Sequence, residues 1–245
     1  MTELTQRALT DESLDAFTPA RRLFRNTVHW AAYRFILTSS QTRVVHVNGL
    51  ELVVPPTVFH PGVFVTSRMF AKFLREQNLE GRSVAEIGTG SGILAISAAK
   101  AGANEVLAID INPAAVLAAE RNAATNGVSE IVKTKVSDLF SAVTFTKIFD
   151  VIISSPPSFE GKPRDMADRA WHAGQGYGGI ALLFEQAYNH LASTGVMFIL
   201  LSSDTNVKYM RKLAFQAGFD WQLVAEKSIW VEAFQIFCLK KRIDR

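Results

Sequence analysis

Short apolar runs rich in β-branched residues alternate with longer alanine- and leucine-rich stretches from residue 82 onward. The short runs are typical of buried strands. They occupy residues 83–87, 105–109, 131–136, 148–153 and 195–201. The longer stretches carry apolar residues at helical spacing and occupy residues 93–101, 113–126, 180–191 and 207–217. This alternation predicts an α/β fold built from βαβ units around a mostly parallel sheet.

Two further apolar runs, 221–226 and 234–239, close the chain with no room for a helix between them. A parallel crossover needs a dozen or more residues, so this pair must be antiparallel. With the five earlier runs, the pattern predicts a seven-stranded sheet with one antiparallel strand.

The character of the chain changes before residue 82. Residues 21–37 are basic and aromatic and predict a helix, while residues 44–54 alternate around Asn48-Gly49, a strong hairpin signal. We therefore expect an accessory helix and hairpin over residues 1–60, packed on a main domain over residues 61–245.

Composition narrows the class of protein. A chain of 245 residues with 48% hydrophobic content suits one main core, and the single cysteine, Cys238, excludes an internal disulfide. The net charge of +3 comes without a dense basic stripe, so nucleic acid is not indicated as a partner. No leader or membrane-spanning run stands out, which predicts a cytoplasmic protein with no membrane partner.

The first candidate site is the loop Glu86-Ile-Gly-Thr-Gly-Ser-Gly92, between a predicted strand and a predicted helix. Glycines let the backbone pass close to a ligand, and the helix N-terminus offers unpaired N–H groups. The loop lacks the Gly-Lys-Ser/Thr of a P-loop, and Ile93 stands where the dinucleotide form has Gly or Ala. A nucleotide-like ligand is the prediction.

Two acidic residues follow at the ends of the next strands. Asp110 lies about twenty residues beyond the loop, where a carboxylate can accept hydrogen bonds from ribose hydroxyls. Asp138 follows the third strand and is placed to accept from an adenine amino group, while Leu139 packs on the ring. Helix capping by Asp110 and a simple turn at Asp138 are the alternative explanations.

Taken together, these segments resemble the successive cofactor motifs of class I S-adenosylmethionine (SAM)-dependent methyltransferases, which have a Rossmann-like fold. The resemblance implies SAM as the cofactor and a set of residues that contact it. These are Thr66, Glu86, Gly88, Thr89, Gly90, Gly92, Asp110, Ile111, Asn112, Asp138, Leu139 and Ser155. An NAD-dependent enzyme shares the first two motifs but not the third.

The candidate acceptor motif follows the fourth strand as Ser155-Pro156-Pro157-Ser158, with Phe159 next. It resembles the Asn-Pro-Pro-aromatic motif of amino-methylating enzymes, and more narrowly the HemK-like group that methylates protein glutamine. The segments 64–67 and 168–174 carry further similarity. Ser155 holds the asparagine position and lacks its amide fork, so glutamine as the acceptor is put in doubt.

Other residues near these motifs remain open at this level. Phe159, Trp171 and Tyr177, with a glycine-rich stretch over 174–179, predict either a lid over the acceptor or a local surface cluster. His60 and His172 are candidate bases, although a lone loop histidine is more often structural. No His, Cys, Asp and Glu cluster has the spacing of a metal site, so no metal is expected.

The sequence therefore predicts a SAM-dependent methyltransferase that transfers methyl to a nitrogen on a small metabolite or a protein side chain. Positioning can supply much of the acceleration of such an in-line displacement. The alternatives are a nucleic-acid base amino-methyltransferase and a SAM-binding protein without catalysis.

Overall fold

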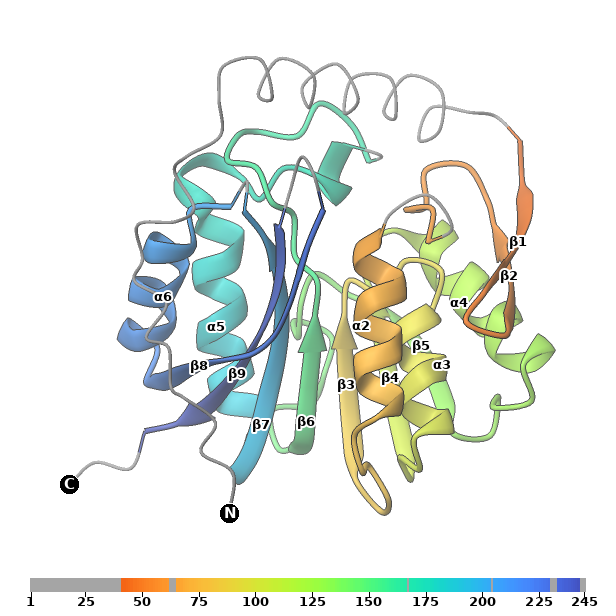
Figure 1. The fold of residues 1–245 in the computed structure, drawn as a ribbon, viewed down its shortest axis with the longest axis horizontal. Coiled ribbons are helices and arrows are strands. Elements are labelled where there is room, and N and C mark those ends of the chain that lie inside the picture. Colours follow the sequence, from red (N-terminus) through yellow and green to blue (C-terminus); the bar gives the residue numbers. More distant parts are fainter. Residues whose placement is uncertain (1–40, 62–64, 167, 204, 230–232, 243–245) are drawn as a thin grey trace.

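The predicted strands and helices assemble into one central sheet with helices on both faces, as a computed structural model shows (Figure 1). The structure describes residues 41–61, 65–166, 168–203, 205–229 and 233–242. The helix predicted over residues 21–37 lies outside the described residues.

The strands are β1 (Arg43–Val47), β2 (Leu50–Val54), β3 (Ser83–Ile87), β4 (Glu105–Asp110), β5 (Val132–Val136), β6 (Phe149–Ser154), β7 (Leu191–Ser202), β8 (Phe219–Ser228) and β9 (Ala233–Lys241). The helices are α2 (Val65–Arg75), α3 (Ile93–Lys100), α4 (Pro113–Thr125), α5 (Gly178–His190) and α6 (Val207–Gln216), with short 3-10 turns η2 (Asp168–Ala170) and η3 (Gln175–Tyr177). The sequence pattern predicted neither helix α2 nor the two 3-10 turns.

The sheet has seven strands in the order β5-β4-β3-β6-β7-β9-β8. Strands β3 to β7 pair in parallel, whereas β9 runs antiparallel to both β7 and β8. The short link over 229–232 leaves no length for a crossover, which is why the last pair is a hairpin. The predicted fold class, with a single reversed strand, is confirmed.

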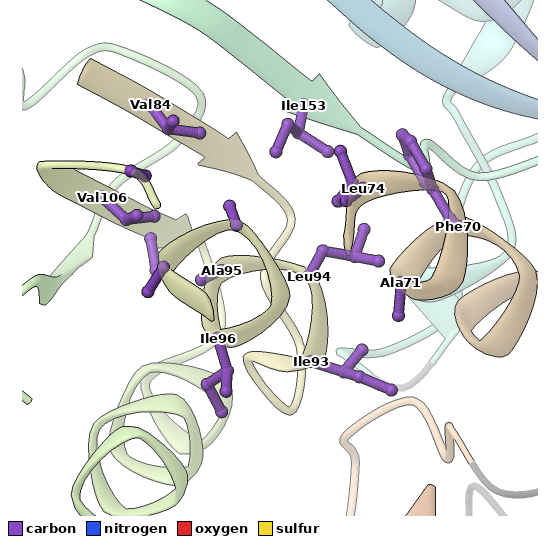
Figure 2. Close-up of a cluster of buried hydrophobic side chains, with 14 of the residues drawn as sticks. Phe70, Ala71, Leu74, Val84, Ile93, Leu94, Ala95, Ile96, Val106 and Ile153 are labelled. Carbon is purple, nitrogen blue, oxygen red and sulfur yellow. The ribbon is translucent and has the colours of Figure 1, made fainter. Parts of the chain in front are cut away.

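Two hydrophobic cores cover the two faces, because successive strand side chains point to opposite sides of the sheet. In β3, Val84 joins the core beneath α2 and α3, while its neighbour Ala85 joins the core beneath α5 and α6. Figure 2 shows the first core, where Phe70 and Leu74 of α2 meet the strands. Each such fully buried side chain contributes roughly 1.5–3 kcal/mol relative to exposure.

The β1–β2 hairpin stands apart from the main sheet and lies beside α4 (Figure 1). Its turn is Asn48-Gly49, with φ of 51° and 77°, the left-handed pair of a type I′ turn. The predicted hairpin is confirmed. In the described part of the chain, no helix is long and apolar enough to cross a membrane.

Candidate functional site

A cavity of about 540 Å³ opens at the carboxyl ends of the parallel strands. Its walls come from the segments that follow β3, β4, β5 and β6, and from residues 57–59, 65–67, 163, 166 and 169–174, among others. The chain leaves β3 toward β4 on one side and the sheet continues through β6 on the other, so the cavity lies at a topological switch point. Open α/β sheets bind their ligands at this place, and the volume is in the range of small-molecule sites.

The glycine loop divides into a part that faces the cavity and a part that packs. Gly88 and Gly90 line the cavity, and no atom lies within 4 Å of a Cβ built on either one. Gly92 does not line it: Gly92 is the left-handed N-cap of α3, and a Cβ there would lie 2.9 Å from Cα of Ala119. The loop therefore presents bare backbone to a ligand at Gly88 and Gly90 and brings α3 close to α4 at Gly92.

The Glu86 side chain holds this loop in place through hydrogen bonds. Its carboxyl is buried and accepts hydrogen bonds from Thr89 Oγ1 at 2.6 Å and from Ala95 N at 2.9 Å. Burial raises the pKa of Glu86 from 4.5 to about 8, against the opposing effect of these hydrogen bonds. The carboxyl is therefore mostly protonated at pH 7 and acts as a neutral brace beneath the cavity.

Asp110 ends β4 at the cavity wall. Its carboxylate accepts from Gly90 N and from Asn112 N, both at 2.9 Å. Burial raises the pKa of Asp110 above its ordinary value, while these backbone hydrogen bonds lower it. Each carboxylate oxygen retains further lone pairs, so this side chain can also accept from ligand hydroxyls.

Asn112 connects the cavity wall to the segment after the hairpin. Its side chain caps α4 by accepting from Ala114 N at 3.0 Å, and its amide donates to Thr57 Oγ1 at 3.1 Å. Thr57 itself lines the cavity with a positive φ of 68°. No periodicity or motif marks Thr57 in the sequence, so sequence reasoning missed it.

The third predicted motif also reaches the cavity. Ser137, Asp138 and Leu139 line it directly after β5, together with Ile111 and Thr66 from other segments. The Asp138 side chain is exposed, and Leu139 has a φ of 51°. The structure thus brings together residues that are far apart in the sequence, at one end of the sheet.

The acceptor motif forms the opposite wall. The residues lining the cavity here are Ser154, Ser155, Pro156, Pro157, Ser158 and Phe159. Ser154 is buried and its hydroxyl donates to the carbonyl of Ile87 at 3.0 Å, which joins the end of β6 to the end of β3. The motif is thereby anchored beside the glycine loop.

A second segment folds back along the acceptor motif. The backbone N of Phe159 donates to the carbonyl of Trp171 at 2.9 Å, and the two rings lie 6.2 Å apart. Both line the cavity. Tyr177 does not: its side chain is buried in the α5 core, and its hydroxyl donates to the carbonyl of Ser158 at 3.5 Å.

The two candidate histidines have different surroundings. His172 lines the cavity, as does Arg169, which sequence reasoning did not single out. His60 is not among the residues lining it, and burial is the main cause of its lowered pKa. A polar cluster of Arg164, Asp168 and His172 also went unrecognised, although their spacing of four residues was visible in the sequence.

Comparison with known proteins identifies related sequences and folds. The family described as ribosomal protein L11 methyltransferase (PrmA) matches residues 30–155, just over half of the chain. The ribosomal protein L11 methyltransferase of Thermotoga petrophila is 43% identical over 101 residues, covering 41% of this chain and 37% of the relative. This chain therefore spans well under half of that relative's length.

Two further matches extend over most of the chain. A Methanocaldococcus jannaschii protein, provisionally named a protein N5-glutamine methyltransferase, is 31% identical over 200 residues, covering 79% of this chain and 96% of the relative. The Thermus thermophilus 16S rRNA N2 G1207 methyltransferase, solved with AdoMet and guanosine, aligns with a TM-score of 0.61 and 23% identity, covering 82% of this chain and 50% of the other. The predicted fold and the predicted cofactor, SAM, are confirmed by these matches.

These comparisons correct two predictions. The predicted function named a nitrogen on a small metabolite or a protein side chain, and it is wrong in giving a small metabolite, because the matching family and the Thermotoga relative are named for a ribosomal protein. The alternatives without catalysis or with a nucleic-acid base as acceptor are not favoured. The prediction that nucleic acid is not a partner is also contradicted, because a neighbour in fold is an rRNA methyltransferase.

Proposed function

The chain belongs to the PrmA family of ribosomal protein L11 methyltransferases, and on this premise we propose that it methylates a side-chain nitrogen of a ribosomal protein. SAM supplies an electrophilic methyl group on a sulfonium sulfur. The observation that carries the proposal is a single cavity that joins the cofactor motifs to the Ser155–Phe159 wall.

The cofactor motifs line one half of the cavity, the cofactor half, and their residues fit SAM by their chemistry. We assign the Asp110 carboxylate to the ribose hydroxyls and the Asp138 carboxylate to the adenine amino group, because both are acceptors at the cavity wall. Gly88 and Gly90 leave bare backbone beside the ligand, where a Cβ would project into open space. The neutral Glu86 beneath them adds no second full charge beside Asp110.

The half of the cavity beside the Ser155–Phe159 wall, the acceptor half, fits a long side chain with a nitrogen at its end. Phe159 and Trp171 offer apolar surface for a methylene stem, and aromatic faces attract a cationic end group. The carbonyls and hydroxyls of the Ser155 to Ser158 turn supply acceptors for N–H groups. The missing asparagine amide favours an amine over a glutamine carboxamide, which departs from the HemK-like pattern.

Methyl transfer to fractionated ribosomes tests the proposal. Ribosomal proteins, rRNA and a metabolite fraction are incubated separately with the enzyme and methyl-labelled SAM, and each product is digested to locate the label. We expect label in one ribosomal protein, as an N-methylated residue. Label confined to rRNA or to metabolites would contradict the proposal.

A pair of aspartate variants controls this experiment. Asp110→Ala removes the carboxylate at the cavity wall, and we expect calorimetry to show at least a 100-fold weaker SAM affinity together with loss of labelling. Asp220→Ala removes an exposed carboxylate on β8, which is not among the residues lining the cavity, and is expected to leave both unchanged. Equal SAM affinity in the two variants would refute the assignment of Asp110.

A further inference from the structure

A buried carboxylate lies directly behind the acceptor wall. The Asp168 side chain is only 1% exposed, yet it accepts three hydrogen bonds from Arg164, from the backbone N at 2.9 Å, from Nε at 3.1 Å and from Nη2 at 2.8 Å. The side-chain hydrogen bonds from Arg164 are the main cause that holds the pKa of Asp168 below its ordinary value. Burying an ionised carboxylate costs free energy unless charged and hydrogen-bonding partners compensate for the lost water.

His172 is the second partner of this carboxylate. Its Nδ1 is buried and lies 3.2 Å from Asp168 Oδ1, although off the direction of a linear hydrogen bond. The backbone N of His172 donates to the carbonyl of Asp168 at 3.0 Å, which fixes the two residues as a unit. A carboxylate at this nitrogen favours the tautomer with the proton on Nδ1, and leaves a lone pair on Nε2.

The His172 ring is buried at Nδ1 but also reaches the cavity. The His172 side chain is 26% exposed and lines the cavity next to the acceptor motif. A Cβ on Gly161 would lie 3.1 Å from His172 Cδ2 and 3.9 Å from Nε2, so any larger residue at this position would crowd the ring. Gly161 is held there by paired backbone hydrogen bonds with Gly174 of 3.2 and 3.1 Å.

We propose that His172 accepts the proton of the acceptor nitrogen and that Asp168 positions its ring for this step. The inference rests on the proposed function, in which the acceptor is a side-chain amine. A lysine amine is protonated at neutral pH, with a pKa of about 10.4, and has no lone pair to attack with until it loses a proton.

The step balances in protons and electrons. His172 Nε2 takes one proton from the acceptor ammonium, leaving a neutral amine and an imidazolium paired with the Asp168 carboxylate. The amine lone pair forms the new N–C bond as the C–S bond of the sulfonium breaks and its electron pair stays on sulfur. The imidazolium then releases its proton to solvent.

Several charged residues lie on the two chain segments that meet at His172. On its own segment they are Arg164, Asp168 and Arg169, and on the facing segment around Gly161 they are Glu160 and Lys162. The Glu160 carboxylate accepts from Gly176 N at 3.0 Å, so it is directed to the loop after His172. Asp168 is the carboxylate at ion-pair distance from the ring.

Kinetics of His172→Gln in the full-length chain test the proposal, with ribosomal protein and labelled SAM as the probes. General-base catalysis contributes on the order of 10²- to 10⁴-fold, so we expect kcat at pH 7.5 to fall about 100-fold. The SAM dissociation constant should stay within about threefold. Near pH 10 solvent begins to deprotonate the amine, and kcat of the variant should then lie less than about tenfold below that of the wild type.

The matched control is His46→Gln, in the hairpin, where the side chain is 72% exposed and is not among the residues lining the cavity. It should leave the rate and its pH profile unchanged. A His172→Gln enzyme with the wild-type rate at every pH would overturn the proposal, as would a deficit that does not depend on pH.

A second measurement does not need turnover. Nitrogen-15 NMR of the histidine rings, with His172 identified by its absence in His172→Gln, reports which ring nitrogen carries the proton. We expect the Nδ1–H tautomer in the wild type and a mixture in Asp168→Asn. An Nε2–H tautomer in the wild type would overturn the proposal, even if labelling of ribosomal protein succeeds. If no protein is labelled, the proposed function fails and the tautomer still decides whether Nε2 can accept a proton.

Discussion

Asn122 and Val53 are joined by two hydrogen bonds although they lie 69 residues apart in the chain. The Asn122 amide oxygen accepts from Val53 N at 2.7 Å, and its amide nitrogen donates to Val53 O at 2.9 Å. The same nitrogen donates to the carbonyl of Ser91 at 2.9 Å. The fully buried Asn122 side chain on α4 therefore hydrogen-bonds to the hairpin backbone as a neighbouring strand would. It also holds the glycine loop through the carbonyl of Ser91.

Asn122→Ala should detach the hairpin from α4. The change leaves buried backbone groups of Val53 and Ser91 without partners, and each such group costs about 1–3 kcal/mol. We expect the free energy of unfolding to fall by about 3 kcal/mol, measured by urea titration. SAM affinity should fall as well, because Ser91 lies in the glycine loop.

The neighbouring Asn126 offers a matched control. It makes the same kind of contact with Glu51, accepting from its N at 3.3 Å and donating to its O at 2.8 Å, but in an exposed setting where water can replace it. Asn126→Ala should cost less than about 1 kcal/mol. Equal losses in the two variants would contradict the role assigned to Asn122.

Substitutions at two glycines of the loop should affect stability and ligand binding differently. Gly92→Ala forces a Cβ to within 2.9 Å of Ala119 at a φ of 81°, so α3 and α4 must move apart. We expect a loss of about 2–4 kcal/mol in the free energy of unfolding, from overpacking together with left-handed strain.

Gly90→Ala carries the backbone strain alone, because no atom lies within 4 Å of its added Cβ. Its stability should fall by only about 1–2 kcal/mol. Because Gly90 lines the cavity, SAM affinity measured by calorimetry should fall by more than tenfold. A Gly92→Ala protein as stable as Gly90→Ala would refute this division of roles.

Local sequence patterns predicted the elements whose cause is itself local. The Asn48-Gly49 turn, the strand periodicity and the short link before β9 each determine geometry within a few residues, and all three appear in the structure. The predicted helices end within two residues of the observed bounds: α4 begins at Pro113 as predicted, capped by Asn112, whereas α5 begins at Gly178, two residues before the predicted start.

Contacts between distant segments were not predictable in this way. The docking of Asn122 on the hairpin, the donation from Asn112 to Thr57 and the contact of Gly92 with Ala119 depend on packing between elements. Gly92 shows this most clearly. The motif predicts one role for all its glycines, whereas in the structure Gly88 and Gly90 line the cavity and Gly92 packs against α4. Helix α2 was not predicted, although its buried residues Phe70, Ala71 and Leu74 lie at helical spacing.

Trp171→Ala should weaken acceptor binding without affecting the cofactor. The residue is 9% exposed, lines the cavity and packs beside Phe159 of the acceptor wall. We expect KM for the ribosomal protein to rise at least tenfold, with the SAM dissociation constant within about threefold. Phe145→Ala removes a ring that is 74% exposed and should change neither constant. A rise in the SAM dissociation constant equal to that in KM would place Trp171 in the cofactor half instead.

Glu86 predicts a specific dependence of stability on pH. Its pKa is raised from 4.5 to about 8 by burial, so the folded state holds a proton that the unfolded state releases. The stabilisation from this proton is fully present below pH 4.5 and is lost as the pH rises to about 8. At 1.36 kcal/mol for each pKa unit, the loss amounts to roughly 4–5 kcal/mol.

Glu86→Gln isolates this contribution, because glutamine keeps an oxygen that can accept from Thr89 and Ala95 and cannot ionise. We expect the variant and the wild type to have similar free energies of unfolding near pH 5, and the variant to be the more stable protein at pH 9. Urea titrations at five pH values across this range would measure the difference. Curves that stay parallel from pH 5 to pH 9 would mean that Glu86 is already ionised in the folded protein, and that its partners outweigh its burial.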